Sequence, residues 1–270
     1  MKLRRIFLYV FLSLIILYVS ICAYMYIFQR NFLYHPYKNN YLRGEKLNAE
    51  IKEIFIPSTE GITLKSWFYK NSNNKYTVLF FHGNAGELGN RIYKLNELKN
   101  LNLNYLIISW RGFSGNKGSP TEQGLYNDAK SAVEWLEKNN IKKNKIILYG
   151  ESLGTGVAVE IGQNQDFAGI ILESPYTSIV DAAKIYYPYL PVDLILKDKY
   201  LSLKKIKNIN SPILLMHGGA DIIIPIAMGK KLFNEIQSKK YGYFPQSDRH
   251  MMTYNSELKF ELQKFIKTLN

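Results

Sequence analysis

Residues 145–162 read KIILYGESLGTGVAVEIG, and they place the motif G-x-S-x-G between two apolar runs. The first run, 145–150, is continuous, which is typical of a strand buried on both faces of a parallel sheet. The second, 155–162, predicts a helix. The two glycines of the motif remove Cβ atoms that would clash in a sharp turn, so Ser152 is exposed at a strained apex. The stretch therefore predicts an α/β fold with Ser152 as a nucleophile.

The same type of segment recurs along the chain. Further continuous apolar runs, each predicting a buried strand, lie at 77–83, 105–110, 168–174 and 212–218. Ahead of them, 51–57 and 62–69 alternate apolar and polar residues around a short turn, which predicts an antiparallel hairpin. Helical stretches separate the later runs. This alternation predicts a mainly parallel central sheet with helices on both faces.

The clearest predicted helix covers about 120–138. Ser119 can cap it, Pro120 suits its first position, and Glu122 would complete a capping box. Apolar residues then recur at helical spacing.

One segment interrupts the alternation of strands and helices. Residues 175–210 are longer than a single crossover helix needs, and they are rich in tyrosine and proline. We predict a short cap-like insertion over one end of the sheet, within a domain that spans 51–270.

The N-terminal segment has the properties of a membrane-spanning helix. No charged side chain occurs from Ile6 to Phe28, and a helix of that length crosses the roughly 30 Å hydrocarbon layer. Lys2, Arg4 and Arg5 precede it. The positive-inside rule then predicts a cytoplasmic N-terminus and a domain on the far, extracytoplasmic or periplasmic side.

Residues 1–30 are therefore interpreted as a single-pass anchor and 31–50 as a juxtamembrane linker. Two alternatives involve cleavage. A signal peptide would have a shorter apolar core and a small-residue cleavage site. A lipoprotein-type cleavage before Cys22 would require a small residue where the chain has Ile21.

A nucleophilic serine needs a base, and the chain has four histidines. His250 follows the last strand-like run, YGYFP, and precedes a helix predicted over about 256–268, so it can reach the turn at the carboxyl ends of the strands. We predict that His250 is the base. His82 and His217 each end a strand before a glycine, and we interpret both as packing or capping residues.

The acid that orients the imidazole is predicted to be Asp221, which follows the 212–218 run by a short loop. Glu173, at the end of the preceding strand, is the rival. Asp248 is too close to His250 in sequence to approach its ring easily.

Two backbone N–H groups are expected to form an oxyanion hole. One belongs to Leu153, directly after the nucleophile, and the other to Asn84 in the sequence HGNAG (82–86). The alternative is a Gly-rich turn between strand and helix without a catalytic role.

Composition limits the partners. The 270 residues include 35 Lys and Arg against 22 Asp and Glu, which gives a net charge of +13. Because the lysines are scattered rather than clustered, we predict a solvated surface and no nucleic-acid binding, with attraction to lipid headgroups as the alternative. Arg111 could contact an anionic group, but we interpret it as part of a structural salt bridge. One cysteine allows no internal disulfide.

With these pieces in order, the chain resembles the α/β-hydrolase superfamily, and more narrowly its membrane-anchored, ABHD-type and serine-aminopeptidase-like serine hydrolases. The resemblance rests on HGNAG (82–86), WRGFSGNKGSPTEQG (110–124), GESLG (150–154), HGGAD (217–221) and His250. It implies the triad Ser152, Asp221 and His250, with an oxyanion hole at Asn84 and Leu153. Trp110 departs from the tyrosine expected in that loop.

These observations predict a serine hydrolase that cleaves an ester or thioester of an acylated or lipid-like substrate through an acyl-enzyme, with no cofactor and no metal. A serine peptidase or amidase is the second reading, because the same nucleophile serves both acyl classes. A non-catalytic scaffold on the hydrolase fold is the third.

Overall fold

A computed structural model describes residues 2–36 and 50–269. At its centre is an eight-stranded sheet of order β1-β2-β4-β3-β5-β6-β7-β8. The strands are β1 (Lys52–Pro57), β2 (Thr63–Tyr69), β3 (Thr77–Phe81), β4 (Asn104–Ile108), β5 (Ile146–Glu151), β6 (Gly169–Glu173), β7 (Ile213–Met216) and β8 (Lys240–Tyr243). Strand β2 is antiparallel to both β1 and β4, and the other neighbours are parallel. The predicted hairpin and mainly parallel sheet are both confirmed.

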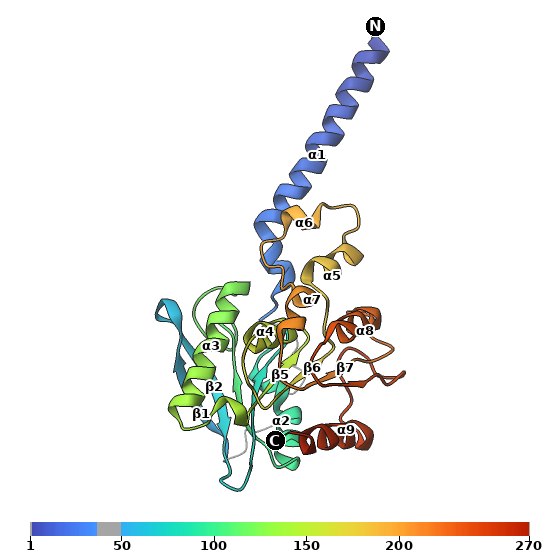
Figure 1. The fold of residues 1–270 in the computed structure, drawn as a ribbon. Helices are drawn as coiled ribbons and strands as arrows, with labels where there is room; N and C mark the ends of the chain where they lie inside the picture. Colours follow the sequence, from blue (N-terminus) through green and yellow to red (C-terminus); the bar gives the residue numbers. More distant parts are fainter. Residues whose placement is uncertain (1, 37–49, 270) are drawn as a thin grey trace.

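Apolar side chains alternate between the two faces of the sheet. In β3, Leu79 and Phe81 belong to one core cluster, and Val78 and Phe80 belong to the other. The covering helices are α3 (Glu122–Lys138), α4 (Leu153–Gly162) and α8 (Ile226–Glu235) on the first face, and α2 (Ile92–Asn100) and α9 (Ser256–Lys267) on the second (Figure 1). Both faces are thus buried, and the carboxyl ends of the parallel strands are left to carry loops.

Helix α3 begins two residues later than its predicted cap implies. Its N-cap is Thr121, whose hydroxyl accepts a hydrogen bond of 2.9 Å from the Gly124 N–H. The prediction that Ser119 caps this helix is therefore wrong, because Thr121 is itself a capping residue that lies closer to the helix. The predicted capping box is wrong too, since Glu122 occupies the first helical position and instead accepts a hydrogen bond from the Lys199 N–H.

Residues 175–210, here called the cap, connect β6 to β7. They contain three short α-helices, α5 (Ile179–Tyr186), α6 (Val192–Ile195) and α7 (Ser202–Lys205), and one turn of 3-10 helix, Ile206–Asn208. Helices α5 and α6 lie beside the N-terminal helix (Figure 1). They are located beyond the end of the sheet at which the turn between β5 and α4 lies. The predicted insertion is thus a structured part of the fold.

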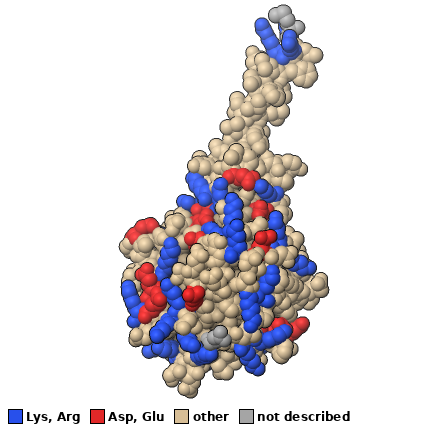
Figure 2. Space-filling view, in the orientation of Figure 1, with Lys and Arg blue, Asp and Glu red and all other residues tan. Residues whose placement is uncertain are grey.

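The N-terminal helix α1 (Lys2–Leu33) is a single helix of 32 residues. By length and apolar composition it can cross a membrane. In Figure 2 charged side chains are spread over the visible face of the domain, whereas the shaft of α1 shows none until its N-terminal end. The helix includes residues 31–33, which the sequence assigns to the linker. Most of that linker, 37–49, lies outside the described residues.

Candidate active site

The turn between β5 and α4 has the geometry predicted from the glycine spacing. Ser152 has φ 50° and ψ −116°, a backbone conformation that costs about 1–3 kcal/mol for a residue with a side chain. Its N–H donates to the Glu173 carbonyl at 2.9 Å, and its carbonyl accepts from the Thr155 hydroxyl at 2.6 Å. A Cβ atom at Gly154 would collide with the Phe81 carbonyl. Only glycine there allows α4 to approach β3 this closely.

The structure brings Ser152, His250 and Asp221 together in one hydrogen-bonded chain. His250 Nε2 lies 2.9 Å from Ser152 Oγ, and His250 Nδ1 lies 2.8 Å from Asp221 Oδ2. Because the carboxylate can only accept, Nδ1 carries the ring proton and Nε2 is free to accept the serine hydroxyl proton. This is the arrangement that activates a serine for attack on a carbonyl carbon.

Asp221 is held as a carboxylate by hydrogen bonds on both of its oxygens. Oδ1 accepts the N–H groups of Ile223 and Ile224 at 2.8 and 2.9 Å, and Oδ2 also lies 3.1 Å from His217 Nε2. Burial by itself would raise the pKa of Asp221, but the hydrogen bonds from His217 and His250 outweigh it, so the pKa lies well below its usual range. The sequence interpretation of His217 as a packing residue missed this contact.

The two other carboxylates that were considered have different partners. Glu173 binds the Lys94 ammonium at 2.7 and 2.8 Å, and it accepts the Tyr149 hydroxyl at 2.6 Å and the Met252 N–H at 3.1 Å. Asp248 accepts the N–H of Thr253 at 3.3 Å.

A buried ion cluster lies directly behind the nucleophile. It consists of Arg91, Lys94, Glu151 and Glu173, all less than a tenth exposed. Glu151 lies 2.6 Å from both Arg91 Nη2 and Lys94 Nζ. Burial alone would raise the pKa of Glu151 and lower that of Lys94, yet the ion pairs reverse both shifts. Glu151 and Lys94 are therefore both charged at neutral pH.

This cluster supports two loops of the site. Glu151 Oε1 accepts the Gly83 N–H at 3.3 Å, next to the loop that contains Asn84. Glu173 accepts the Met252 N–H, two residues beyond His250. The cluster is not predictable from the sequence, because lysine and arginine are rarely buried and nothing in the local pattern marks Lys94 as an exception.

Two structural interpretations from the sequence are confirmed. His82 is fully buried, and burial together with Arg91 lowers its pKa to about 3, so the ring is neutral. Its carbonyl accepts the indole N–H of Trp110 at 3.0 Å, which explains how tryptophan is accommodated in that loop. Arg111 forms a buried ion pair with Asp128 at 2.8 Å, with 3% and 0% of the two side chains exposed.

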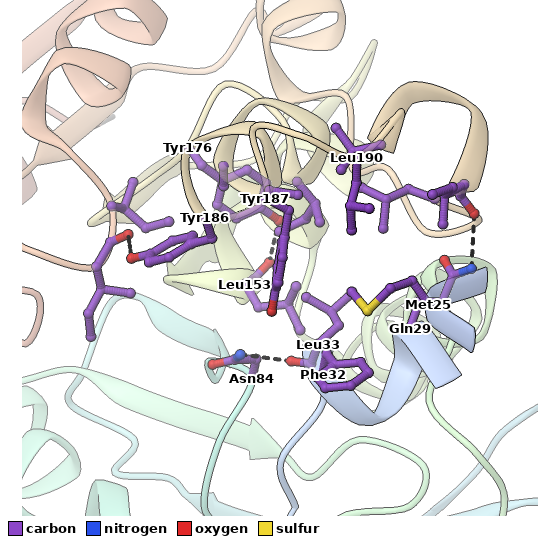
Figure 3. Close-up of a pocket in the computed structure, with 18 of the residues that line it drawn as sticks. Met25, Gln29, Phe32, Leu33, Asn84, Leu153, Tyr176, Tyr186, Tyr187 and Leu190 are labelled. Carbon is purple, nitrogen blue, oxygen red and sulfur yellow. Dashed lines mark hydrogen bonds between the residues drawn. The ribbon is translucent and has the colours of Figure 1, made fainter. Parts of the chain in front are cut away.

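A cavity of about 340 Å³ lies above Ser152, and Asn84 and Leu153 also line it. Its walls come from the end of α1, from the cap, and from the loop after β7 (Figure 3). The described residues that line it include apolar and aromatic side chains and no Asp or Glu. Tyr186 closes one side by donating to the Ile223 carbonyl at 2.6 Å.

Comparisons with known proteins agree with this geometry. A family model described as serine aminopeptidase, S33, matches residues 72–197. The uncharacterized protein Rv2307c of Mycobacterium tuberculosis is 31% identical, over 80% of this chain and 79% of its own length. This chain belongs to the α/β-hydrolase superfamily. The hydrolase is also 32% identical to the zebrafish (Danio rerio) lysophosphatidylserine lipase ABHD12, over 70% of this chain and 58% of that protein.

Among solved structures, the Pyrococcus furiosus esterase Pf2001 superposes with a TM-score of 0.72 at 18% identity, covering 88% of the hydrolase and 99% of that chain. This likeness establishes the shared fold. The relatives support an esterase- or lipase-like hydrolase, as the sequence predicts.

Proposed function

We propose that the protein is a membrane-anchored serine hydrolase that cleaves carboxylic ester or thioester bonds of acylated, lipid-like substrates. The observation that carries this proposal is the unbroken hydrogen-bonded chain from Ser152 through His250 to Asp221 at the base of an apolar cavity. The named lipase among the relatives supports an amphiphilic substrate.

In the proposed reaction His250 Nε2 accepts the hydroxyl proton as Ser152 Oγ attacks the acyl carbon. The resulting oxyanion is bound by the backbone N–H groups of Asn84 and Leu153. Its collapse breaks the bond to the leaving oxygen or sulfur, which takes the proton from His250 and departs as an alcohol or thiol. Water then donates a proton to His250 while it attacks the acyl-enzyme. Collapse of this second oxyanion breaks the bond to Ser152 Oγ, which takes the proton from His250 as the acid is released. Asp221 stays ionised throughout and stabilises the imidazolium.

The proposed topology follows from α1. Lys2, Arg4 and Arg5 keep the N-terminus in the cytoplasm, and the hydrolase domain lies on the far side of the membrane. The anchor is retained rather than cleaved as a signal peptide, because residues near its C-terminal end are part of the domain. Gln29, for example, is 6% exposed and hydrogen-bonded to the cap.

Covalent labelling tests the nucleophile directly. Full-length protein in detergent is treated with a fluorophosphonate probe, which modifies activated serines. We expect labelling of the wild type and its loss in Ser152→Ala and His250→Ala, with a fall in ester turnover of roughly 10⁴-fold or more. Ser72→Ala, an exposed serine in the loop between β2 and β3, is the matched control and should label fully. A folded wild type that does not label would contradict the proposal and favour a non-catalytic scaffold.

A peptidase or amidase reading is weakened by the cavity. An aminopeptidase must bind the α-ammonium of its substrate, and a buried cation needs an anionic partner. The described residues that line the cavity include no acidic side chain. To separate the two readings, matched ester and amide substrates with the same acyl group are compared, and we expect kcat/KM to favour the ester strongly. Equal rates would support the amidase reading.

A further inference from the structure

The C-terminal end of α1 is built into the hydrolase domain rather than attached to it by a flexible joint. The Gln29 side-chain amide donates to the Ile195 carbonyl at 3.0 Å, and its oxygen accepts the Lys197 N–H at 2.7 Å. Arg30 forms an ion pair with Asp198 at 2.9 Å. Two residue positions of the helix thus bind three positions of the cap.

The helix is also fixed to the loop that carries the predicted oxyanion donor. The Leu33 carbonyl accepts the Asn84 side-chain amide at 2.8 Å (Figure 3). One residue further on, the Tyr34 hydroxyl lies 2.9 Å from that of Tyr200. The position of α1 relative to Ser152 is therefore set by the fold.

Because of this attachment, α1 forms one wall of the cavity. Met25, Phe32 and Leu33 line it on one side, and Tyr187 and Leu190 of the cap line it on the other (Figure 3). Ser152 also lines the cavity. Met25 lies eight residues, or about 12 Å of helix, before Leu33. The cavity consequently extends from the nucleophile along the helix, toward the membrane.

The sequence of α1 sets the depth at which the cap meets the bilayer. Residues from Ile6 to Met25 are uncharged and rise about 30 Å, which matches the hydrocarbon layer. Lys197 of the cap places its ammonium 4.0 Å from the centre of the Tyr26 ring, a pair suited to the headgroup region. The hydrocarbon of the near leaflet therefore begins at about Met25.

The rim of the cap reaches beyond that level. The Tyr18 hydroxyl donates to the Tyr189 carbonyl at 3.0 Å, and Tyr18 lies seven residues, or about 10 Å, further into the hydrocarbon than Met25. Only Ile6 to Leu17 then remain ahead of the cap contact, a rise of about 18 Å, which is too short to span the layer. The rim itself exposes apolar surface, with Tyr189 88% and Leu194 84% exposed.

We propose that α1 and the cap rim together form an acyl-chain channel that opens into the lipid of the leaflet beside the hydrolase domain. The substrate is a long-chain acyl ester resident in that leaflet, whose chain enters sideways between the helix and residues 187–190. The anchor helix is then a substrate-binding wall as well as a tether. This inference rests on the proposed function, since it assigns the substrate source for the same site.

The first experiment measures chain-length preference. Full-length protein in phosphatidylcholine vesicles is assayed with p-nitrophenyl palmitate and p-nitrophenyl butyrate. Met25→Trp fills the far part of the channel and should lower the palmitate-to-butyrate ratio of kcat/KM by about tenfold. Ile27→Trp introduces the same ring on the same helix at a position that is 65% exposed and does not line the cavity, so the ratio should not change.

An equal palmitate-to-butyrate ratio of kcat/KM in the wild type and in both variants would overturn the channel. If the protein nevertheless turns over ester and Ser152 is labelled by the fluorophosphonate, the proposed function stands. The absence of all turnover and labelling would overturn both.

The second experiment needs no catalysis. Tryptophan is placed at the cap rim in Tyr189→Trp and, as a control, on α9 in Phe260→Trp, which is 61% exposed. Both are introduced into Ser152→Ala protein in vesicles of phosphatidylcholine brominated along the acyl chains. We expect clear additional quenching of fluorescence for Tyr189→Trp and none for Phe260→Trp. No quenching at position 189 would show that the rim lies outside the hydrocarbon and would overturn the proposal. In the turnover assay, a kcat/KM for acyl thioesters in solution that exceeds the kcat/KM for esters in the bilayer would assign the channel to a soluble substrate instead.

Discussion

Two groups of charged and polar residues lie at the carboxyl edge of the sheet. Glu151 belongs to one group, and the next residue in the chain, Ser152, belongs to the other. In the hydrogen-bonded chain from Ser152 to Asp221, Ser152 lines the cavity and the histidine side chain is 13% exposed. The ion cluster around Lys94 is closed, and every charge in it has an opposite charge within hydrogen-bond distance. In the proposed mechanism the first group exchanges a proton with a substrate, whereas the second holds its neighbours in place. The same residue types therefore serve chemistry or architecture according to their access and their partners.

The largest expected effect distinguishes Asp221 from Glu173 as the acid that orients His250. Asp221→Asn should lower kcat/KM by roughly 10⁴-fold, because an amide donor facing His250 Nδ1 would favour the wrong imidazole tautomer. Steady-state kinetics check this, and a denaturation curve verifies that the variant is folded under the assay conditions. A loss of less than about tenfold would contradict the assignment of Asp221 and reopen the case for Glu173.

The next effect concerns stability. Lys94→Met leaves Glu151 and Glu173 buried without the cation that they share, and it should lower the free energy of unfolding by about 3–5 kcal/mol. Guanidinium denaturation gives the value. Adding Glu173→Gln to Lys94→Met should recover part of the loss, as expected for interacting neighbours. Lys259→Met, at a partly exposed ion pair with Glu97, is the control with little change. Equal losses of unfolding free energy in Lys94→Met and Lys259→Met would show that the buried cluster stabilises the fold no more than a partly exposed ion pair does.

A third prediction uses pH to probe the cluster. The pKa of Glu151 is depressed in the folded state below its ordinary 4.5, so its ion pairs stabilise the fold above that pH and are lost as the pH falls through and below it. Unfolding free energies measured from pH 7 to pH 3 should fall less steeply for Glu151→Gln than for the wild type, from a lower starting value. Glu134→Gln, an exposed carboxylate of α3, should keep the wild-type slope. Parallel slopes for Glu151→Gln and the wild type would be the contrary result.

The smallest effect concerns His217, which we regard as a positioning residue for Asp221. His217→Phe keeps a ring in the buried space but removes one of several hydrogen bonds to the carboxylate, and kcat should fall by about five- to tenfold. The acid limb of the pH–rate profile should also move to higher pH, because Asp221 then offers more of its negative charge to His250. A fall in kcat with no movement of the profile would indicate a packing role alone.

How far the sequence predicted this molecule depends on the range of the interactions involved. Buried strands appear as apolar runs, and the spacing of two glycines indicates the sharp turn at Ser152. The sheet and this turn were therefore predictable from the local sequence pattern. Asp221 and His250 were found by residue type and chain order, which limit the choices in this fold. The hydrogen-bonded geometry among them is consistent with that choice.

The remaining features depend on tertiary contacts that no local pattern contains. Lys94 has the sequence setting of an ordinary surface lysine, and its burial becomes favourable only because Glu151 and Glu173 meet it in space. Thr121 and Ser119 are both acceptable caps, and only the packing of α3 decides between them. The role of Gln29 depends on the cap, more than 160 residues away in the chain.

The positive φ of Ser152 has a consequence for natural selection. Glycine adopts that conformation without strain, so here, as at other non-glycine positions of positive φ such as Ser174 and Tyr200, the residue that is easiest for the backbone is not the residue that the chain contains. A protein selected only for persistence would drift toward the relaxed residue and lose its hydroxyl. Retaining a serine at this apex is thus a standing cost in stability, which the proposed use of the hydroxyl as a nucleophile would offset.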